Sequence, residues 1–455
     1  MFLPLADRFG DDETLELFSE SSLVEAWLSV ERALAATQAE LGVIPAEAAA
    51  LIEAVALSDN IDLVKLRART LVVGYPILPM LEQLGDRSAD AARYLHWGAT
   101  TQDIMDTGLA LLGARAFDRI EALTEALGGE LAAKADAHRA TVMAGRTHAQ
   151  PAVPITFGGK VAVWLAELTR HRERLRAARA RFAVVQLFGA AGTAAALGPQ
   201  SRRIRHGLAE RLGLLAVDVP WHAARDSVAE AGLVLAATAG TCGKLAREVI
   251  ELSRPELGEV REAGGHLRGA SSTMPQKANP IGSEVVVGLS ILAAQQSGAL
   301  LAALQGTHER SAGEWQAEWD AVPLLFATTA GALGGTHRLM QELQVFPEQM
   351  RENLESEGGL IMAEAAMIAL AGGVGRAAAH ALVAESSSVA RAERITLREA
   401  LERALDGESL AALPPLDEVL DVDSYLGESD SIVTAAVAAW GEVRASSSPA
   451  GRARP

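Results

Sequence analysis

Residues 269–284, GASSTMPQKANPIGSE, bring several kinds of reactive side chain into one short stretch. They supply hydroxyl groups, a cation, an amide and a carboxylate, from Ser271, Ser272, Lys277, Asn279 and Glu284. A hydroxyl or a carboxylate can move a proton, and an ammonium group can hold an anion. The stretch is therefore a candidate for proton-transfer chemistry on an anionic molecule.

The residues around this stretch predict a loop that runs into a helix. Residues 254–270 hold four glycines and show no apolar periodicity, which is typical of a loop. Asn279 is expected to be the helix N-cap and Pro280 the first helical residue, which would place Lys277 beside the positive helix N-terminus. That combination suits an anion, although composition alone favours a solvated loop with an ordinary cap.

The order of residues in the stretch also resembles a known family. SSTMPQKANP (271–280) resembles the signature loop of the fumarase/aspartase superfamily, with Ala270 in place of the usual preceding glycine. WGATTQDIMDT (97–107), AGRTHAQPAVPITFG (144–158) and FGAAGTAAALG (188–198) are similar to three further superfamily regions. The resemblance spans nearly the whole chain. It implies an all-α, three-domain fold, a homotetramer around a long central helical bundle, and active sites shared between subunits.

Members of this superfamily remove a proton from the carbon beside a carboxylate and expel a leaving group from the next carbon, usually giving fumarate. Such chemistry needs a base, positive charge for a dianionic intermediate and often an acid. The resemblance assigns the base to Ser271. It assigns to His148 the role of general acid, or of holding a water or the substrate, and it assigns to Glu284 the orientation of that histidine.

The remaining candidate residues are expected to bind a small dicarboxylate substrate. They are Thr100, Thr101, Arg146, Thr147, Lys277, Asn279, Arg225 and Arg310. The resemblance supplies the lysine, the asparagine and the threonines, and Arg146 is a charge close to them in sequence. Arg225 and Arg310 belong to the stretches 221–225 and 308–319, which are expected to contact the leaving group.

Three segments are similar to bacterial 3-carboxy-cis,cis-muconate cycloisomerases: PWHAARD (220–226), THERSAGEWQAEW (307–319) and LDEVLDVDSYLG (416–427). In those enzymes the position of His148 is typically apolar, and the carboxylate of Glu284 is usually absent. Both departures favour elimination over ring closure within one substrate. Adenylosuccinate lyase fits less well, because its RYSRPEM-like N-terminal segment is missing here.

The sequence therefore predicts a fumarate-forming lyase acting on a small 2-substituted succinate, with nitrosuccinate lyase as the specific candidate. The alternative is 3-carboxy-cis,cis-muconate cycloisomerase, an enzyme of aromatic degradation. A third interpretation is a non-catalytic scaffold protein with the same fold. The joint presence of Ser271, Lys277, His148 and Glu284 disfavours that reading.

Composition limits the other possibilities. The chain has 455 residues and a net charge of −17, which argues against nucleic acid and anionic membranes as partners. Its single cysteine, Cys242, forms no intrachain disulfide and fits a reducing cytoplasm. There is no metal-ligand spacing and no nucleotide-binding glycine pattern, so neither a metal nor a cofactor is expected. Residues 285–304 are apolar but contain paired glutamines, which favours a core helix shared between subunits over a membrane span.

The elements that must position these residues are mostly helices. Breaks between the helical patterns divide the chain into regions 1–105, 106–350 and 351–455. The middle region contains the signature loop near 258–279, and the last region ends in a tail, 445–455, that is expected to be disordered. Ser22 and Glu25 form an expected capping box for the first long helix. Further helices are expected at 106–140, 156–184, 201–212, 226–253, 280–305, 321–344 and 363–384.

Overall fold

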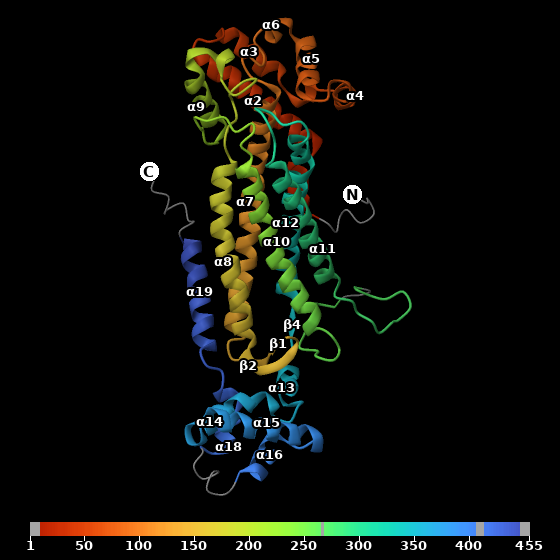
Figure 1. Ribbon diagram of the computed structural model, residues 1–455. Coiled ribbons are helices and arrows are strands. Elements are labelled where there is room, and N and C mark those ends of the chain that lie inside the picture. Colours follow the sequence, from red (N-terminus) through yellow and green to blue (C-terminus); the bar gives the residue numbers. More distant parts are fainter. Residues whose placement is uncertain (1–9, 265–267, 406–413, 446–455) are drawn as a thin grey trace. The chain divides into compact units, whose positions relative to one another are not determined.

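The computed structural model describes residues 10–264, 268–405 and 414–445 (Figure 1). The contacts between residues divide the chain into two compact units. Unit 1 consists of Met1–Thr124, His171–Gly243 and Val285–Gly334, and unit 2 of Glu125–Arg170, Lys244–Glu284 and Gly335–Pro455. The division into regions at 105 and 350 stays a prediction. Residues 446–455 of the expected disordered tail lie outside the described residues.

The described chain is helical apart from two small sheets, which confirms the predicted all-α class. Its first helices are α1 (Asp12–Leu17), α2 (Glu20–Glu40), α3 (Ala46–Val55), α4 (Leu63–Val73), α5 (Ile77–Arg87), α6 (Ala89–Ala92) and α7 (Thr101–Ala137). After the strands β1 (Val142–Thr147) and β2 (Gln150–Thr156) come α8 (Phe157–Phe182), α9 (Ser201–Leu212), α10 (Asp226–Leu252), α11 (Ile281–Ala303) and α12 (Glu314–Glu342). The C-terminal helices are α13 (Pro347–Glu355), α14 (Ala363–Val374), α15 (Arg376–Glu393), α16 (Leu397–Ala404), α18 (Leu416–Val419) and α19 (Ser429–Ala445). The second sheet pairs β3 (Val260–Arg261) with β4 (Gln344–Val345), and short 3-10 turns include η3 (Ala195–Gln200) and η4 (Leu360–Met362).

Several expected boundaries are wrong: α7 begins at Thr101 instead of 106, and α12 begins at Glu314 instead of 321. The N-cap of α2 is Ser19, whose side chain accepts a hydrogen bond from the Ser22 backbone N–H, while the Ser22 hydroxyl donates to the Glu16 carbonyl. The capping box therefore does not form at Ser22, because the helix begins a turn earlier. The expected helix 363–384 is two helices, α14 and α15, separated at Gly375, whose φ of 83° interrupts the helical backbone.

The core of unit 1 lies where the long helices meet. Phe117 of α7, Phe182 of α8 and Phe326 of α12 form an aromatic cluster, with the closest centroids, those of Phe117 and Phe326, 5.0 Å apart at a near-perpendicular angle. Edge-to-face contact of this kind adds to the free energy gained by burying the rings. These contacts join α7, α8 and α12 through their apolar faces.

α11 is the exception to this burial. Among the described residues it is the one helix long and apolar enough to cross a membrane by length and composition, and α13 together with η4 and α14 passes the same test only as a bent pair. Only 33% of the apolar window of α11 is buried within the chain. The core helix of a soluble protein meets the same criterion, so this finding is weak evidence for a membrane span.

The hairpin of β1 and β2 in unit 2 is absent from the sequence prediction. Thr147 pairs with Gln150, so the connecting turn contains only His148 and Ala149, with φ of 51° and 62°. Positive φ at both central residues defines a type I′ turn, which matches the twist of the two strands. β1 also packs against α13, below it in Figure 1. The hairpin thus presents His148 at an exposed tip.

The left-handed turn yields a stability prediction. Ala149→Gly should raise the free energy of unfolding by about 0.5–1 kcal/mol, because glycine avoids the left-handed penalty and only part of this gain is lost to its freedom in the unfolded chain. Ala133→Gly, at an exposed position inside α7, is the control and should lower it by about 1 kcal/mol. Urea denaturation at one protein concentration measures both changes, and equal destabilisation by the two variants would contradict the type I′ turn.

Candidate functional site

In unit 1 a buried carboxylate organises the segment that carries Thr100 and Thr101. Asp103, on the first turn of α7, accepts hydrogen bonds from the backbone N–H groups of Thr100 (3.0 Å), Phe188 (3.0 Å) and Gly189 (2.9 Å). Its Oδ1 also lies 2.8 Å from Nε2 of His222. Asp103 has no exposed surface, so these partners satisfy a charge that would otherwise be costly to bury. The threonines and the glycine-rich loop are thereby fixed to the same residue.

Arg310 meets this segment directly. Its Nε donates to Oε1 of Gln102 (2.8 Å), and its Nη2 donates to the Ala190 carbonyl (3.2 Å) and to Oγ1 of Thr100 (3.4 Å). The guanidinium is only partly buried, and none of its described partners is a carboxylate. Two of the predicted substrate-binding residues, Thr100 and Arg310, are therefore neighbours, and Arg310 keeps a positive charge available for an anion.

Arg225 has a different environment. It is 5% exposed, donates to Asp106 (2.8 and 3.2 Å) and forms an ion pair with Glu318. Burial alone would lower the pKa of Arg225, but the carboxylates of Asp106 and Glu318 outweigh it and raise that pKa. Burial raises the pKa of Glu318 although Arg225 opposes the shift, as expected for two carboxylates sharing one cation. The charge of Arg225 is thus committed within the protein, which favours a positioning role over substrate contact.

The chain before Thr100 is held from α2. Glu31, 1% exposed, lies 2.6 Å from Nδ1 of His96 and also accepts from the His96 backbone N–H, while Gln38 donates to the Trp97 carbonyl. Burial alone would lower the pKa of His96, but the Glu31 carboxylate outweighs it and raises that pKa. These contacts stabilise the left-handed backbone of His96, at φ 58°, directly before the motif.

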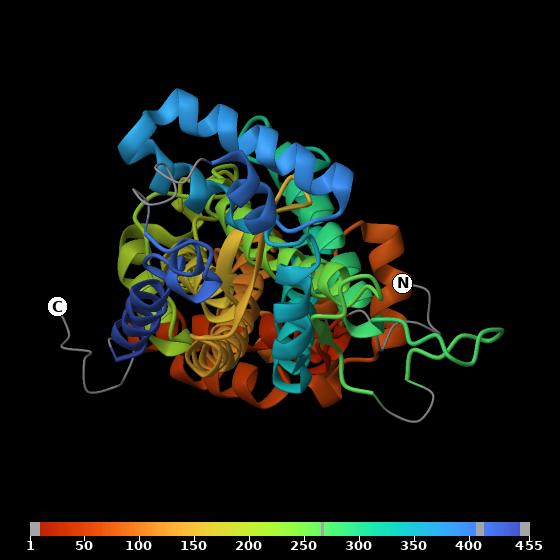
Figure 2. The ribbon, with the colours of Figure 1, turned by 90° about the horizontal axis from the view of Figure 1, so that it is seen from below.

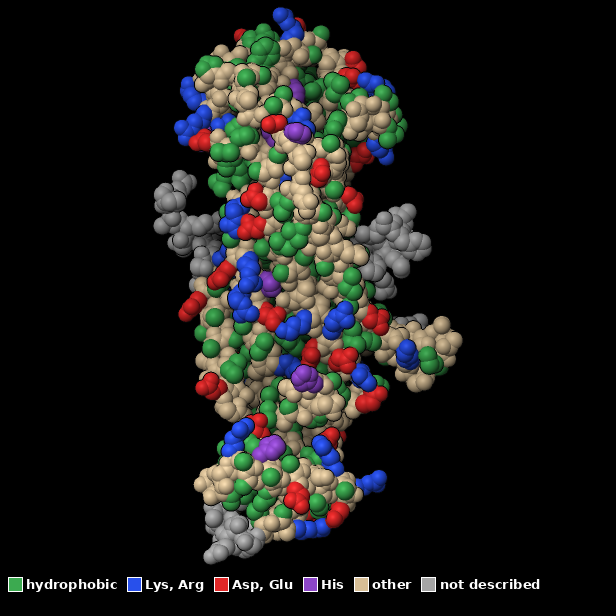
Figure 3. Space-filling view, viewed as in Figure 1, with side chains coloured by type: hydrophobic (Ala, Val, Ile, Leu, Met, Phe, Trp, Pro, Cys, Tyr) green, Lys and Arg blue, Asp and Glu red, His purple; other side chains and the backbone are tan. Residues whose placement is uncertain are grey.

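In unit 2 the signature loop extends away from the rest of the unit, as Figures 1 and 2 show, and it forms a separate projection in Figure 3. Lys277 is exposed, and Ser271 is partly exposed. Oγ of Ser271 accepts hydrogen bonds from the backbone N–H groups of Thr273 (3.3 Å) and Met274 (3.1 Å). Two N–H donors directed at one hydroxyl oxygen would stabilise negative charge on that oxygen.

The ends of the loop are joined through Asn279. Its backbone N–H and its side-chain amide both donate to the Gly269 carbonyl, at 2.9 and 3.0 Å. Gly269 has φ of 70°, and a Cβ there would lie 2.3 Å from the Asn279 carbonyl oxygen, so only glycine fits. The left-handed residue is therefore Gly269, while Ala270 has an ordinary negative φ. This explains why Ala270 can replace the superfamily glycine.

The expected N-cap of α11 is wrong. Asn279 directs its amide to Gly269, and the first turn is capped by Glu262, which accepts from the N–H groups of Gly282 (3.1 Å) and Ser283 (2.8 Å). Glu262 is 8% exposed. Because an internal carboxylate occupies this helix N-terminus, the positive charge for an anionic ligand must come from elsewhere. On the described part of the loop Arg268 pairs with Glu342, and Lys277 is an exposed cation with no such ion pair.

The second motif contributes the hairpin residues. Arg146 binds the fully buried Glu259 through two hydrogen bonds, of 2.9 and 2.6 Å, and Asn353 donates to the same carboxylate. This pair fixes the hairpin to the chain before β3. Thr147 and His148 lie beyond it, exposed at the tip. In the described part of the chain, His148 forms no hydrogen bond or ion pair with Glu284, which is exposed on α11.

The chain thus presents its predicted residues in two sets. Unit 1 holds Thr100, Thr101, Arg225 and Arg310, and unit 2 holds Arg146, Thr147, His148, Ser271, Lys277, Asn279 and Glu284. Sequence reasoning missed the supporting residues Gln102, Asp103, Asp106, His222, Glu259, Glu262 and Glu318. Five of them lie inside quoted motifs, so their position beside the candidates was the available signal: Gln102, Asp103, Asp106, His222 and Glu318.

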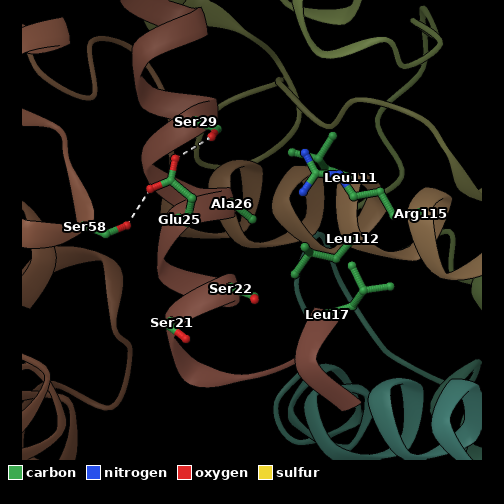
Figure 4. Close-up of a pocket in the computed structure, with 10 residues that line it drawn as sticks. All are labelled: Leu17, Ser21, Ser22, Glu25, Ala26, Ser29, Ser58, Leu111, Leu112 and Arg115. Carbon is green, nitrogen blue, oxygen red and sulfur yellow. Dashed lines mark hydrogen bonds between the residues drawn. The ribbon is translucent and has the colours of Figure 1, made fainter. Parts of the chain in front are cut away.

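The cavity drawn in Figure 4 contains none of these residues. It lies in unit 1 and has a volume of about 350 Å³. Its carboxylate, Glu25, accepts hydrogen bonds from Ser29, Ser58 and Arg32. Because Glu25 is already bound by these three donors and no motif residue lines the cavity, it is a poor candidate for the reaction.

Comparison with known proteins agrees with the motifs. Residues 8–294 match the family described as Lyase, and residues 359–436 match the adenylosuccinate lyase C-terminus. The fold and these matches define an enzyme of the lyase family, and the chain belongs to the fumarase/aspartase superfamily.

Three relatives narrow the class. The chain is 41% identical to 3-carboxy-cis,cis-muconate cycloisomerase of Pseudomonas aeruginosa, over 93% of both chains. It is 33% identical to N-acetyl-S-(2-succino)cysteine lyase of Dickeya dadantii, over 94% of both. The crystal structure of 3-carboxy-cis,cis-muconate lactonizing enzyme from Pseudomonas putida superposes with a TM-score of 0.90 at 36% identity, covering 97% of this chain and 99% of that one.

The two arginines of unit 1 should respond differently to substitution. Arg225→Met leaves Asp106 and Glu318 buried without their cation and should lower the free energy of unfolding by about 3–5 kcal/mol. Arg310→Met removes only hydrogen bonds to neutral groups, costing about 1 kcal/mol, and should lower kcat/KM at least tenfold. Urea denaturation and steady-state kinetics measure the two effects. Similar losses of stability in both variants would refute the distinction.

Proposed function

We propose that the chain is a fumarate-forming lyase acting on a small 2-substituted succinate, with nitrosuccinate as the specific substrate and nitrous acid as the product released. The observation that carries the proposal is the pair of backbone N–H groups at Oγ of Ser271. A serine hydroxyl is a weak base unless its alkoxide is stabilised. The loop supplies that stabilisation from Thr273 and Met274.

In the proposed reaction Ser271 removes a proton from the carbon next to a carboxylate, and the electron pair spreads into that carboxylate. Lys277 and Arg310 then bind the resulting negative charge, and Thr100, Thr101, Thr147 and Asn279 supply hydrogen bonds. These donors must act locally, since the net charge of −17 repels a dicarboxylate at long range. The electron pair returns to form the double bond as the leaving group departs, and His148 donates to that group or positions it.

The proposed assembly is a homotetramer with sites completed by neighbouring subunits. Support comes from α11, whose apolar surface is largely uncovered within one chain and includes Ile291 at 49% and Leu301 at 40% exposure. Burying such a surface between subunits is strongly favourable. His148 and Glu284, which are not bonded to each other within one chain, would then be paired across subunits. We place the enzyme in the cytoplasm, because its single cysteine, Cys242, is buried and cannot form an intrachain disulfide.

The second candidate is 3-carboxy-cis,cis-muconate cycloisomerase. It is favoured by the identity of 41% to a relative with that name and by a solved relative of the same kind. None of the three relatives named above is described as acting on nitrosuccinate, so that substrate rests on His148 and Glu284. The two residues therefore decide between the candidates.

The base can be tested with adjacent serines. Ser271→Ala should lower kcat by about 10²–10⁴-fold, the usual contribution of general base catalysis. The mass of the folded protein in solution should not change. Ser272→Ala, one position away on the same loop, is the control and should stay within tenfold of wild type. Fumarate absorbance after addition of nitrosuccinate measures turnover. If Ser271→Ala keeps activity within tenfold of wild type, the base lies elsewhere.

The two candidate functions differ in their need for the histidine. In the lyase, His148→Leu and Glu284→Ala should each slow elimination, and the double variant should be little slower than the slower single variant, because the residues act as one unit. In the cycloisomerase, both substitutions should leave the loss of 3-carboxymuconate absorbance nearly unchanged. Full elimination activity in His148→Leu would move the cycloisomerase to first place.

A further inference from the structure

A cavity of about 580 Å³ opens in unit 1 between α2, α4, α7 and α12. Three tryptophans line it: Trp27, Trp315 and Trp319. Leucines and Met105 complete most of the wall, so the lining is mainly apolar. This volume lies within the range of sites that hold small organic ligands. None of the proposed catalytic or substrate-binding residues lines the cavity.

The aromatic wall is preformed. Trp315 and Trp319 meet edge to face at 5.0 Å, and Tyr75 contacts both rings at 6.0 Å. Nε1 of Trp315 is also fixed by a hydrogen bond to Oδ1 of Asp106 (3.0 Å). Rings held in this way offer flat surfaces to a planar ligand without first having to be ordered, which reduces the free-energy cost of binding.

The polar groups of the lining are mostly committed. Asp106 accepts from Arg225, Gln102 and Trp315, and Glu20 forms an exposed ion pair with Arg67 at 3.3 Å. Trp319 differs, because its Nε1 is buried without a hydrogen-bond partner. Leaving a buried donor unpaired is unfavourable, so a ligand atom that accepts this hydrogen bond would gain affinity.

We propose that this cavity binds a small, planar and mainly apolar molecule that carries one hydrogen-bond acceptor, such as an aromatic ketone. Stacking on the indole rings would supply most of the affinity, and the N–H of Trp319 would orient the acceptor. None of the proposed dicarboxylate-binding residues lines this site, although Trp315 and Trp319 belong to the stretch 308–319. The site shares Asp106 with the network that holds Arg225 and Gln102. The other possible occupant of this opening is a neighbouring copy of the chain, because Leu71 on α4 is 88% exposed.

The first experiment titrates the full-length protein with N-phenyl-1-naphthylamine, whose fluorescence rises in apolar sites. One probe should bind per chain in a saturable manner. Thr70→Trp, which narrows the cavity from α4, should weaken binding at least tenfold, as should Leu109→Phe from α7. Val72→Trp is the matched control, since it adds the same ring on α4 at a position that is 77% exposed and outside the lining.

The second experiment tests the acceptor. Displacement of the probe by 2-acetylnaphthalene should require about fivefold less ligand than displacement by 2-ethylnaphthalene, the effect of one hydrogen bond. Trp319→Phe keeps an aromatic ring but removes the donor and should abolish the preference. An unchanged preference in Trp319→Phe would overturn the role of its N–H.

Two further outcomes would overturn the site itself. The first is that wild-type protein shows no saturable binding while light scattering gives a mass of about four chains, which would mean that a neighbouring subunit covers the cavity. The second is that Thr70→Trp and Val72→Trp bind the probe equally well, which would place the probe elsewhere on the surface.

Discussion

The buried carboxylate of Asp103 is the constraint on which the candidate site of unit 1 depends. An ionised carboxylate without exposed surface must have partners, and here they are three backbone N–H groups and the imidazole of His222. Those partners come from the Thr100 segment, from the glycine-rich loop and from the chain before α10. One charge therefore brings three distant parts of the sequence together, and the position of Thr100 follows from satisfying it.

A second buried charge cluster extends this arrangement. Asp106 lies one turn after Asp103 on α7, and it binds Arg225, which binds Glu318 on α12. Burial raises the pKa of Glu318, and the nearby Asp106 carboxylate adds to that rise, while Arg225 opposes it. Such a cluster contributes little net stability compared with apolar packing, but it tolerates few alternative arrangements. Its role is to fix which residues of α7, α10 and α12 face each other.

Prediction from the sequence was most accurate where the apolar periodicity of a helix ends at a glycine or proline. The helix expected at 201–212 is α9, which ends at Gly213 with φ of 67°. It failed for the β1–β2 hairpin because the turn residues, His148 and Ala149, carry no glycine or asparagine signal for positive φ, and because two prolines interrupt the second strand. Motifs identified the candidate catalytic and substrate-binding residues. Their buried partners, such as Glu259 and Glu318, were missed because a lone acid in a helix or loop does not reveal which distant arginine it will bind.

The capping of α11 changes how the site can hold a dianion. If the helix N-terminus were free, its backbone N–H groups and its dipole could stabilise the intermediate regardless of the position of the loop. Glu262 takes those N–H groups, so helix α11 contributes structure and not charge. In unit 2, Arg146 pairs with Glu259 and Arg268 pairs with Glu342. Lys277 and the N–H groups around Ser271 have no such carboxylate partner among the described residues, and they lie on the same exposed loop. The proposed base and the groups that would stabilise its charge therefore occupy one segment of the chain. Catalytic competence in this protein would consequently depend on the position of the loop, since no preformed anion hole at α11 can operate before the loop reaches the substrate.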